Sequence, residues 1–138
     1  MKSFKILFSC FYIFAFITVA KGQSTDTKQM AQDSITGPEI HFEIMVYDFD
    51  TIQKGSSARC EFTFTNTGNE PLILEKVKTS CECTIAKWSK KPIMPGKSGV
   101  LKIIYSTRTI GYFFRTIAVI SNAKTNPVEL LIKGTVIK

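Results

Sequence analysis

Of the four cysteines, Cys10 lies in the predicted N-terminal signal peptide, and three remain after its removal: Cys60, Cys81 and Cys83. These three carry the most distinctive side-chain chemistry of this sequence. Nearby thiols of an exported protein tend to pair, and an odd number leaves one over. On a regular strand, the Cα atoms of residues two apart lie about 6.6 Å from each other, at the upper edge of disulfide geometry. A bond between Cys81 and Cys83 therefore needs a turn or bulge at Glu82, and a bond from Cys60 across the core is geometrically easier if the strands face each other. We expect Cys60 either to fill space in the core or to form that cross-core bond.

The spacing of Cys81 and Cys83 fits two functions, thiol–disulfide exchange and the binding of a soft metal such as Cu(I) or Zn²⁺. Two thiols supply only half of a zinc site, and the remaining ligands would have to come from His41, Met45 or Met94, which no spacing places nearby. Thioredoxin-like chemistry uses two intervening residues that open a helix, whereas this segment is predicted to be extended. Packing thiols or a structural disulfide are therefore favoured, and we expect no metal and no cofactor.

Acid–base catalysis usually needs a histidine or a cleft with paired carboxylates. The one histidine, His41, lies in an alternating segment and is expected on the wet face of a strand. Asp48 and Asp50 are two residues apart and are candidates for a carboxylate pair or a Ca²⁺ contact, but the turn near Lys54 and Gly55 favours a capping role. The sequence also has no glycine-rich phosphate loop. We expect a protein that is not an enzyme and has no catalytic residues.

Two loops supply candidate binding residues. Residues 87–91 place a tryptophan among lysines, a pattern found at contacts with nucleic acids or anionic glycans. A solvated loop whose tryptophan covers the end of the fold is the favoured interpretation. Residues 107–112 form the second loop. The residues singled out in the two loops are Trp88, Lys90, Lys91, Arg108 and Tyr112.

The elements that must position these residues are strands. From Ala58 to Asn66 apolar side chains alternate with polar ones, which is typical of a sheet with one wet and one buried side. The polar cluster that follows, in which Gly68 is free to adopt a positive φ, is predicted to reverse the chain. Further strands are predicted at residues 40–47 with a short continuation to 52, and at 72–84, 100–106, 112–121 and 128–137, with a type II turn at 94–97. About seven strands separated by turns predict an all-β antiparallel sandwich.

A secretory signal peptide is predicted at the N-terminus. Lys2 and Lys5 precede an apolar run at residues 6–20, and the small residues Ala20 and Gly22 suit cleavage after Gly22. The run of about 15 residues is shorter than the roughly 20 needed to span a bilayer, so a membrane anchor is disfavoured. The expected parts of the chain are a signal peptide at 1–22, a flexible segment at 23–37 and one sandwich domain at 38–138.

Export implies a mature protein in the periplasm or outside the cell. No later segment is long and apolar enough to span a membrane. Cleavage removes three lysines and leaves 15 basic residues against 11 acidic ones, so the formal net charge falls from +7 to +4. Because the basic residues are spread along the chain, no nucleic-acid partner is expected.

Five motifs in this order resemble a known family. They are Tyr47-Asp48-Phe49-Asp50-Thr51-Ile52, then Phe62-Thr63-Phe64-Thr65-Asn66-Thr67-Gly68-Asn69-Glu70-Pro71-Leu72, Ser80-Cys81-Glu82-Cys83-Thr84, Pro92-Ile93-Met94-Pro95-Gly96-Lys97-Ser98-Gly99 and Ile132-Lys133-Gly134. Over residues 38–136 the sequence is similar to the bacterial domain-of-unknown-function family 1573. The resemblance implies an immunoglobulin-like sandwich in exported or envelope proteins and brings no activity or substrate. Glu82 stands where the family usually has glycine, and the position of Cys60 is commonly not cysteine.

The sequence thus predicts a non-catalytic, exported, immunoglobulin-like domain that binds or scaffolds a protein or glycan of the cell envelope or the extracellular space. Such sandwiches bind through their end loops or by adding a partner strand to an exposed edge. The alternative is a thiol-redox or copper-handling protein that acts through Cys81-Glu82-Cys83.

Overall fold

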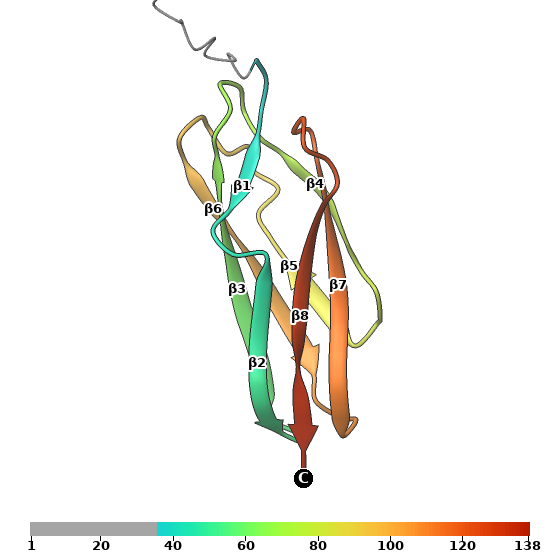
Figure 1. The fold of residues 1–138 in the computed structure, drawn as a ribbon. Helices are drawn as coiled ribbons and strands as arrows, with labels where there is room; N and C mark the ends of the chain where they lie inside the picture. The colour runs from blue at the N-terminus through green and yellow to red at the C-terminus, as the bar shows by residue number, and fades with distance from the viewer. Residues whose placement is uncertain (1–35) are drawn as a thin grey trace, which may run out of the picture. The chain divides into compact units, whose positions relative to one another are not determined.

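The structure, a computed structural model, describes residues 36–138, and their regular secondary structure consists of strands. Eight strands form two four-stranded sheets, in the orders β1-β3-β6-β5 and β2-β8-β7-β4 (Figure 1). The strands are β1 (Ile40–Phe42), β2 (Val46–Gln53), β3 (Ser57–Asn66), β4 (Leu74–Thr79), β5 (Thr84–Lys87), β6 (Ser98–Ser106), β7 (Gly111–Ser121) and β8 (Val128–Ile137). The predicted all-β sandwich is confirmed.

The predicted signal peptide, residues 1–22, and residues 23–35 of the predicted flexible segment lie outside the described residues. Within residues 36–138, no helix is long and apolar enough to cross a membrane.

The core lies between the two sheets and is built from alternate residues of each strand. On β3 the inward side chains of Ala58, Cys60, Phe62 and Phe64 are at most 5% exposed, as the alternation predicts. The inward side chains of the two sheets pack against each other, so a single hydrophobic cluster fills the sandwich. Its largest fully buried side chains include Phe62, Phe113, Leu72, Leu101, Ile103, Ile117, Leu130 and Ile132.

The expected continuous strand at residues 40–47 is wrong in one respect, because the chain changes sheet within it. β1 pairs antiparallel with β3 in the first sheet, whereas β2 pairs parallel with β8 in the second. The crossing exposes Ile44 and Met45, each at 43%, and Val46 at 48%. After the crossing the alternation resumes on the other parity, so that Tyr47 and Phe49 pack against the core.

A second change of sheet breaks the extended segment predicted at residues 72–84. β4 pairs with β7 in the second sheet and β5 pairs with β6 in the first, and a turn at residues 80–83 joins them (Figure 1). We call this turn the cysteine turn. A turn at residues 107–110 makes a similar passage from β6 in the first sheet to β7 in the second, and we call it the β6–β7 turn.

The corner after β3 is held by the buried side chain of Asn66, which donates to Glu70 O and accepts the Gly68 N–H, rather than by a positive φ at Gly68. Gly68 does not have the predicted positive φ. An added Cβ there would instead collide with the backbone of Gly37 and Pro38, so the glycine permits a close approach of two chain segments.

The predicted type II turn at residues 94–97 is confirmed, since Gly96 has a φ of 73° and the Lys97 N–H donates to Met94 O at 3.0 Å.

Candidate functional site

The cysteine turn brings two cysteines together that a regular strand would hold apart. Cys81 and Cys83 form a disulfide with a Cα–Cα distance of 5.2 Å, well inside the usual range. Cys60 remains a free, buried thiol, so the cross-core bond is not formed. The sheet register explains why: Cys60 pairs with Ile103, which pairs with Ala86, three residues beyond Cys83 and two strands away.

Cys60 is a packing residue with little reactivity. Burial, and secondarily the charge of the adjacent Glu61, raises the pKa of the Cys60 thiol to about 12. The thiol therefore stays protonated at neutral pH, and the thiolate is the reactive form. Of the two roles left open for Cys60, the structure assigns it the filling of space in the core.

A pocket of about 550 Å³ opens between the cysteine turn and the β6–β7 turn. Its size is in the range of small-molecule sites, which usually combine apolar walls with a few polar groups. Tyr105, which stacks on Phe113 with ring centroids 3.9 Å apart, contributes a rigid part of the wall. The side chains that line the rest of it are Glu82, Cys83, Ile85, Ile104, Arg108, Ile110, Tyr112 and Arg115, among others.

The most unusual group in this pocket is Arg115 on β7. It follows the alternation of the inward-facing residues Phe113 and Ile117, so its side chain lies toward the core side of the sheet. Its Nη1 donates to Phe114 O at 2.9 Å, and its Nε is buried without a hydrogen-bond partner. Buried polar groups nearly always have a partner, so the unpaired Nε makes Arg115 unusual among residues 36–138.

Neither arginine of the pocket has a carboxylate partner among residues 36–138. The two ion pairs found there join Lys102 to Glu61 at 3.2 Å and Lys133 to Asp48 at 3.1 Å. Arg108, on the exposed β6–β7 turn, adds a second positive charge at the rim, and Glu82 adds one negative charge. The formal charge of the ionisable lining is therefore +1, which favours an anionic ligand.

The residues singled out in the sequence divide into two groups. Arg108 and Tyr112 line the pocket. Trp88 is half-buried against the core and its Nε1 donates to Leu74 O at 3.1 Å, as expected of a tryptophan that covers the fold. Lys90 and Lys91 are exposed in the segment after β5, away from the residues that line the pocket.

Sequence reasoning missed Arg115, although a signal for it was present. It occupies a position on β7 at which the alternation demands an apolar side chain, between Phe113 and Ile117. A charged residue on the inward face of a strand is expensive unless something compensates it. That conflict marks Arg115 as a candidate functional residue.

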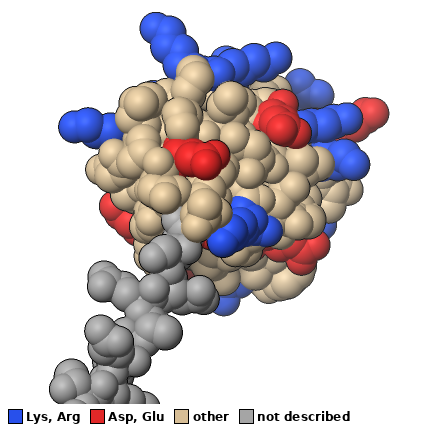
Figure 2. Space-filling model, turned by 90° about the horizontal axis from the view of Figure 1, so that it is seen from above, with Lys and Arg blue, Asp and Glu red and all other residues tan. Residues whose placement is uncertain are grey.

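Charges elsewhere on the domain are mixed. At the end that carries the β3–β4, β5–β6 and β7–β8 loops, basic and acidic side chains are interspersed over a largely uncharged surface (Figure 2). No single basic patch covers this end, unlike the surfaces that bind nucleic acids.

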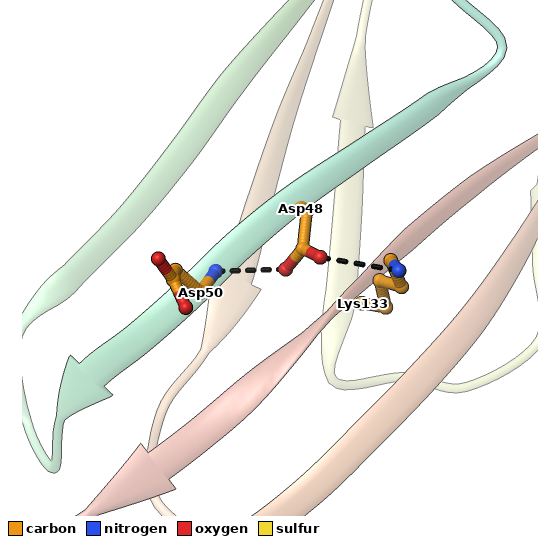
Figure 3. A network of polar contacts seen from close by, with 3 residues as sticks. All are labelled: Asp48, Asp50 and Lys133. Atoms are coloured by element: carbon orange, nitrogen blue, oxygen red, sulfur yellow. Dashed lines mark hydrogen bonds and ion pairs between the residues drawn. The ribbon is translucent and has the colours of Figure 1, made fainter.

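The Asp48 carboxylate stabilises β2 and links it to β8. Asp48 Oδ1 accepts the Asp50 N–H at 2.8 Å and Oδ2 pairs with Lys133, as Figure 3 shows. Asp50 has a φ of 58° at the irregularity where the register with β8 shifts. Asp48 thus caps the bulge of its own strand rather than the later turn. Within the described residues, no three His, Cys, Asp or Glu side chains are grouped so that they could hold a metal ion.

Asp48 should make the stability of the domain depend on acidity. The Asp50 N–H, and then Lys133, lower the pKa of Asp48 below its ordinary value of 3.8. A carboxyl group whose pKa is lower in the folded than in the unfolded state stabilises the fold at pH values above its unfolded pKa. This contribution is lost as the pH falls through the folded pKa. We expect wild type to be more stable than Asp48→Asn at neutral pH, and the difference between their urea midpoints to shrink below about pH 4. A difference that stays constant down to about pH 2 would contradict this account.

Comparison with known proteins gives one family match and several structural likenesses. A family model described as a protein of unknown function, DUF1573, matches residues 40–136. No curated protein matches the sequence.

Three similar solved structures show the range of proteins that share the fold. A protein of unknown function from Porphyromonas gingivalis W83 has a TM-score of 0.66 at 19% identity; the match covers 76% of this chain and 50% of that one. The ASH/PapD-like domain 7 of human CEP192 has a TM-score of 0.63 at 9% identity, over 74% and 87%. The secreted serine protease VesC from Vibrio cholerae has a TM-score of 0.56 at 18% identity, over 71% and 23%. At these identities the likeness is one of fold, and this chain spans half the length of the P. gingivalis protein.

Proposed function

The chain belongs to the DUF1573 family of proteins of unknown function, and from that premise we propose that it is a non-catalytic binding domain whose ligand occupies the pocket between the cysteine turn and the β6–β7 turn. One observation carries the proposal: a pocket of about 550 Å³ is lined by two arginines, Arg108 and Arg115, and neither has a carboxylate partner among residues 36–138. Unpaired cations beside apolar walls favour a bound anionic partner.

The walls of the pocket support the same proposal. Ile85, Ile110 and Tyr112 are 54%, 46% and 67% exposed, which is high for apolar side chains gathered at one opening. Clustered exposed apolar side chains next to a few polar groups are typical of binding sites. The site has no histidine and no paired carboxylates among its lining residues, which favours binding over acid–base catalysis.

Export is part of the proposal. The basic, then apolar, then small-residue order of residues 2–22 supports a secretory signal, and a disulfide between Cys81 and Cys83 is compatible with an oxidising compartment. The ligand would then be a component of the cell envelope or of the extracellular space. Crosslinking in cells can identify the protein or glycan that carries this ligand.

A photo-crosslinker placed in the pocket should capture the ligand in cells. We expect benzoylphenylalanine at Ile110 to give discrete adducts, and the same group at Met94, which is similarly exposed at 54% but lies in the β5–β6 loop, to give none. The double substitution Arg108→Ala and Tyr112→Ala should reduce the Ile110 adducts at least about tenfold, since it removes a charge and an aromatic wall. The matched control, Lys90→Ala with Lys91→Ala, should leave them unchanged. Equal adducts from both crosslinker sites, or none from Ile110, would overturn the proposal.

A thiol-redox role is the second candidate, because the Cys81–Cys83 disulfide lies partly exposed and Cys83 lines the pocket. Copper handling has less support. His41 lies on β1, at the opposite edge of the sheet from β5, and Met94 lies near the Asn66 end of the sheet, so neither is placed beside the cysteines.

Thiol counting with and without reductant, together with a Cu(I) titration, tests this second candidate. Under the redox or copper alternative, wild type gains two reactive thiols at mild reducing potential or takes up Cu(I), and the Cys81→Ser, Cys83→Ser variant does neither. Equal behaviour of the two proteins would exclude it.

A further inference from the structure

A second hollow adjoins the pocket on the outer face of the first sheet. It has a volume of about 400 Å³, and Ile104 lines both this hollow and the pocket between the cysteine turn and the β6–β7 turn. Its charged lining residues are Arg59, Glu61, Lys87 and Lys102, and we call it the basic hollow. The two depressions are therefore neighbours on β6, and one ligand can reach into both.

The register of the sheet arranges the outward side chains in two rows that cross β5, β6 and β3. The first row consists of Lys87, Lys102 and Glu61, and the second of Ile85, Ile104 and Arg59. The rows are two residues apart along each strand, a distance of about 6.6 Å. Two lysines thus stand beside two isoleucines on the same face.

The first row places like charges next to each other. Lys87 lies directly opposite Lys102, an arrangement that destabilises a strand pair. Glu61 forms an ion pair with Lys102, whereas neither Lys87 nor Arg59 has a carboxylate partner among residues 36–138. Three basic side chains and one acidic one give the basic hollow a formal charge of +2. A negatively charged ligand would relieve this repulsion, and both unpaired cations are exposed, so a ligand can reach them.

The second row excludes a partner that offers charge alone. Ile85 is 54% exposed and lines the pocket together with Ile110 and Tyr112. An anionic glycan has no aliphatic side chain with which to cover these residues, whereas an apolar side chain of a peptide would remove their surface from water. In an extended peptide, alternate side chains lie on one face with the same spacing of about 6.6 Å that separates the two rows. An apolar residue and an acidic residue two positions away can therefore contact both rows at once.

We therefore propose that the pocket and the basic hollow together bind an extended, acidic peptide segment of a partner protein. An apolar side chain of the segment lies against Ile85 and Ile104, and an acidic side chain two residues away pairs with Lys87. This inference rests on the proposed function and specifies its partner.

NMR titration with four probes tests the inference. The parent probe is acetyl-Glu-Ser-Leu-Ser-Glu-amide, whose acidic residues flank leucine on both sides and so suit either chain direction. The second probe has glutamine for both glutamates, the third has serine for leucine, and the fourth is tetragalacturonate, a carboxylated glycan. We expect the parent to bind, and each of the other three to bind at least about fivefold more weakly, because each lacks the charges or the apolar group.

Three results of this titration would overturn the inference. They are the absence of binding by the parent peptide, equal binding of the parent and either altered peptide, and binding of tetragalacturonate as tight as that of the parent. The last result would identify the partner as a glycan.

Three charge variants assign the effect to the basic hollow. Lys87→Gln should weaken binding of the parent about threefold, as expected for an exposed ion pair. Glu61→Gln should strengthen it about two- to threefold, because it removes a repulsive charge and frees Lys102. Lys78→Gln is the matched control, an exposed lysine on β4, the corresponding edge strand of the other sheet, and should have no effect. Equal effects of Lys87→Gln and Lys78→Gln would place the acidic residues elsewhere and reject the inference.

A fourth variant tests the apolar contact. Ile85→Ser changes an exposed side chain and should weaken binding of the parent about threefold, but it should leave the affinity for the serine-substituted probe unchanged, since that probe has no leucine to lose its contact. Equal losses for both probes would mean that Ile85 does not contact the leucine, contrary to the inference.

The two levels of the hypothesis fail in different ways. Adducts from a crosslinker at Ile110 that Arg108→Ala with Tyr112→Ala abolishes, but that Lys87→Gln leaves unchanged, would leave the proposed function standing and reject its extension into the basic hollow.

Discussion

Replacing Asn66 with alanine should lower the free energy of unfolding by about 3–5 kcal/mol, because three part-buried backbone groups lose their partner at about 1–3 kcal/mol each. The Asn66 side chain is completely buried. Its Nδ2 donates to Glu70 O at 2.7 Å and Ile93 O at 2.8 Å, and its Oδ1 accepts the Gly68 N–H at 3.0 Å. One side chain therefore joins the β3–β4 corner to the segment before β6.

Asn122→Ala is a matched control for this substitution. Asn122 also bridges two backbone groups, accepting from the Ile73 N–H at 2.8 Å and donating to Pro71 O at 3.1 Å, but it is exposed. Water can replace its bonds, so the expected cost is about 1 kcal/mol or less. Urea unfolding of both variants measures the difference; similar losses for Asn66→Ala and Asn122→Ala would show that burial is not what gives Asn66 its weight.

Replacing Phe62 with alanine should cost about 3–5 kcal/mol, the usual range for a buried phenylalanine, since it removes apolar surface from the core and leaves a cavity. Phe62 is 0% exposed at the centre of β3, and its ring and that of Tyr47 meet edge to face with centroids 6.5 Å apart. Tyr47 lies on β2 in the other sheet, so the substitution removes a contact between the two layers.

Phe114→Ala is the matched control, because the same atoms are deleted from a ring that is 52% exposed on β7. We expect a loss below about 1 kcal/mol. Thermal unfolding distinguishes the two variants, since 1 kcal/mol shifts the melting temperature by about 4–8 °C in a domain of this size. Equal shifts would mean that the two-layer core described here does not exist in solution.

Most strands could be predicted because their signal is local. The limits predicted for the strands at 58–66 and 112–121 differ from the observed β3 and β7 by a single residue, and the predicted strand at 128–137 coincides with β8. Successive side chains of a strand point to opposite faces, so an alternating sequence identifies a strand whatever its neighbours are. The type II turn at Gly96 was predictable for the same reason, since proline followed by glycine suits that turn alone.

Two changes of sheet could not be predicted, because each depends on which partner strand is available. Residues 40–47 and 72–84 are each extended on both sides of a passage between sheets. The alternation before and after each passage is that of an ordinary strand, and nothing local says which sheet offers the next free edge. The choice of sheet is decided by pairing with strands that lie far away in the sequence: β2 pairs with β8, and β4 pairs with β7.

The candidate site was likewise predictable only in part. Arg108 and Tyr112 could be selected by residue type and loop position, and Arg115 could have been selected by its conflict with the alternation on β7. That these residues surround one pocket with Cys83 was not predictable, because it requires the cysteine turn and the β6–β7 turn to lie side by side. The Cys81–Cys83 bond was disfavoured because the segment was taken as a regular strand, which would hold the two sulfur atoms apart, but the turn at Glu82 that the bond requires is present.

The amino-acid sequence by itself determined that this protein is built from strands and which side chains of most of them face inward, since both follow from the geometry of a few consecutive residues. Only the tertiary structure decided which sheet each strand joins, which cysteines meet, and that the Nε of Arg115 is buried without an acceptor. Those properties arise where residues distant in the chain are brought together, and the packing of the whole sandwich sets those distances.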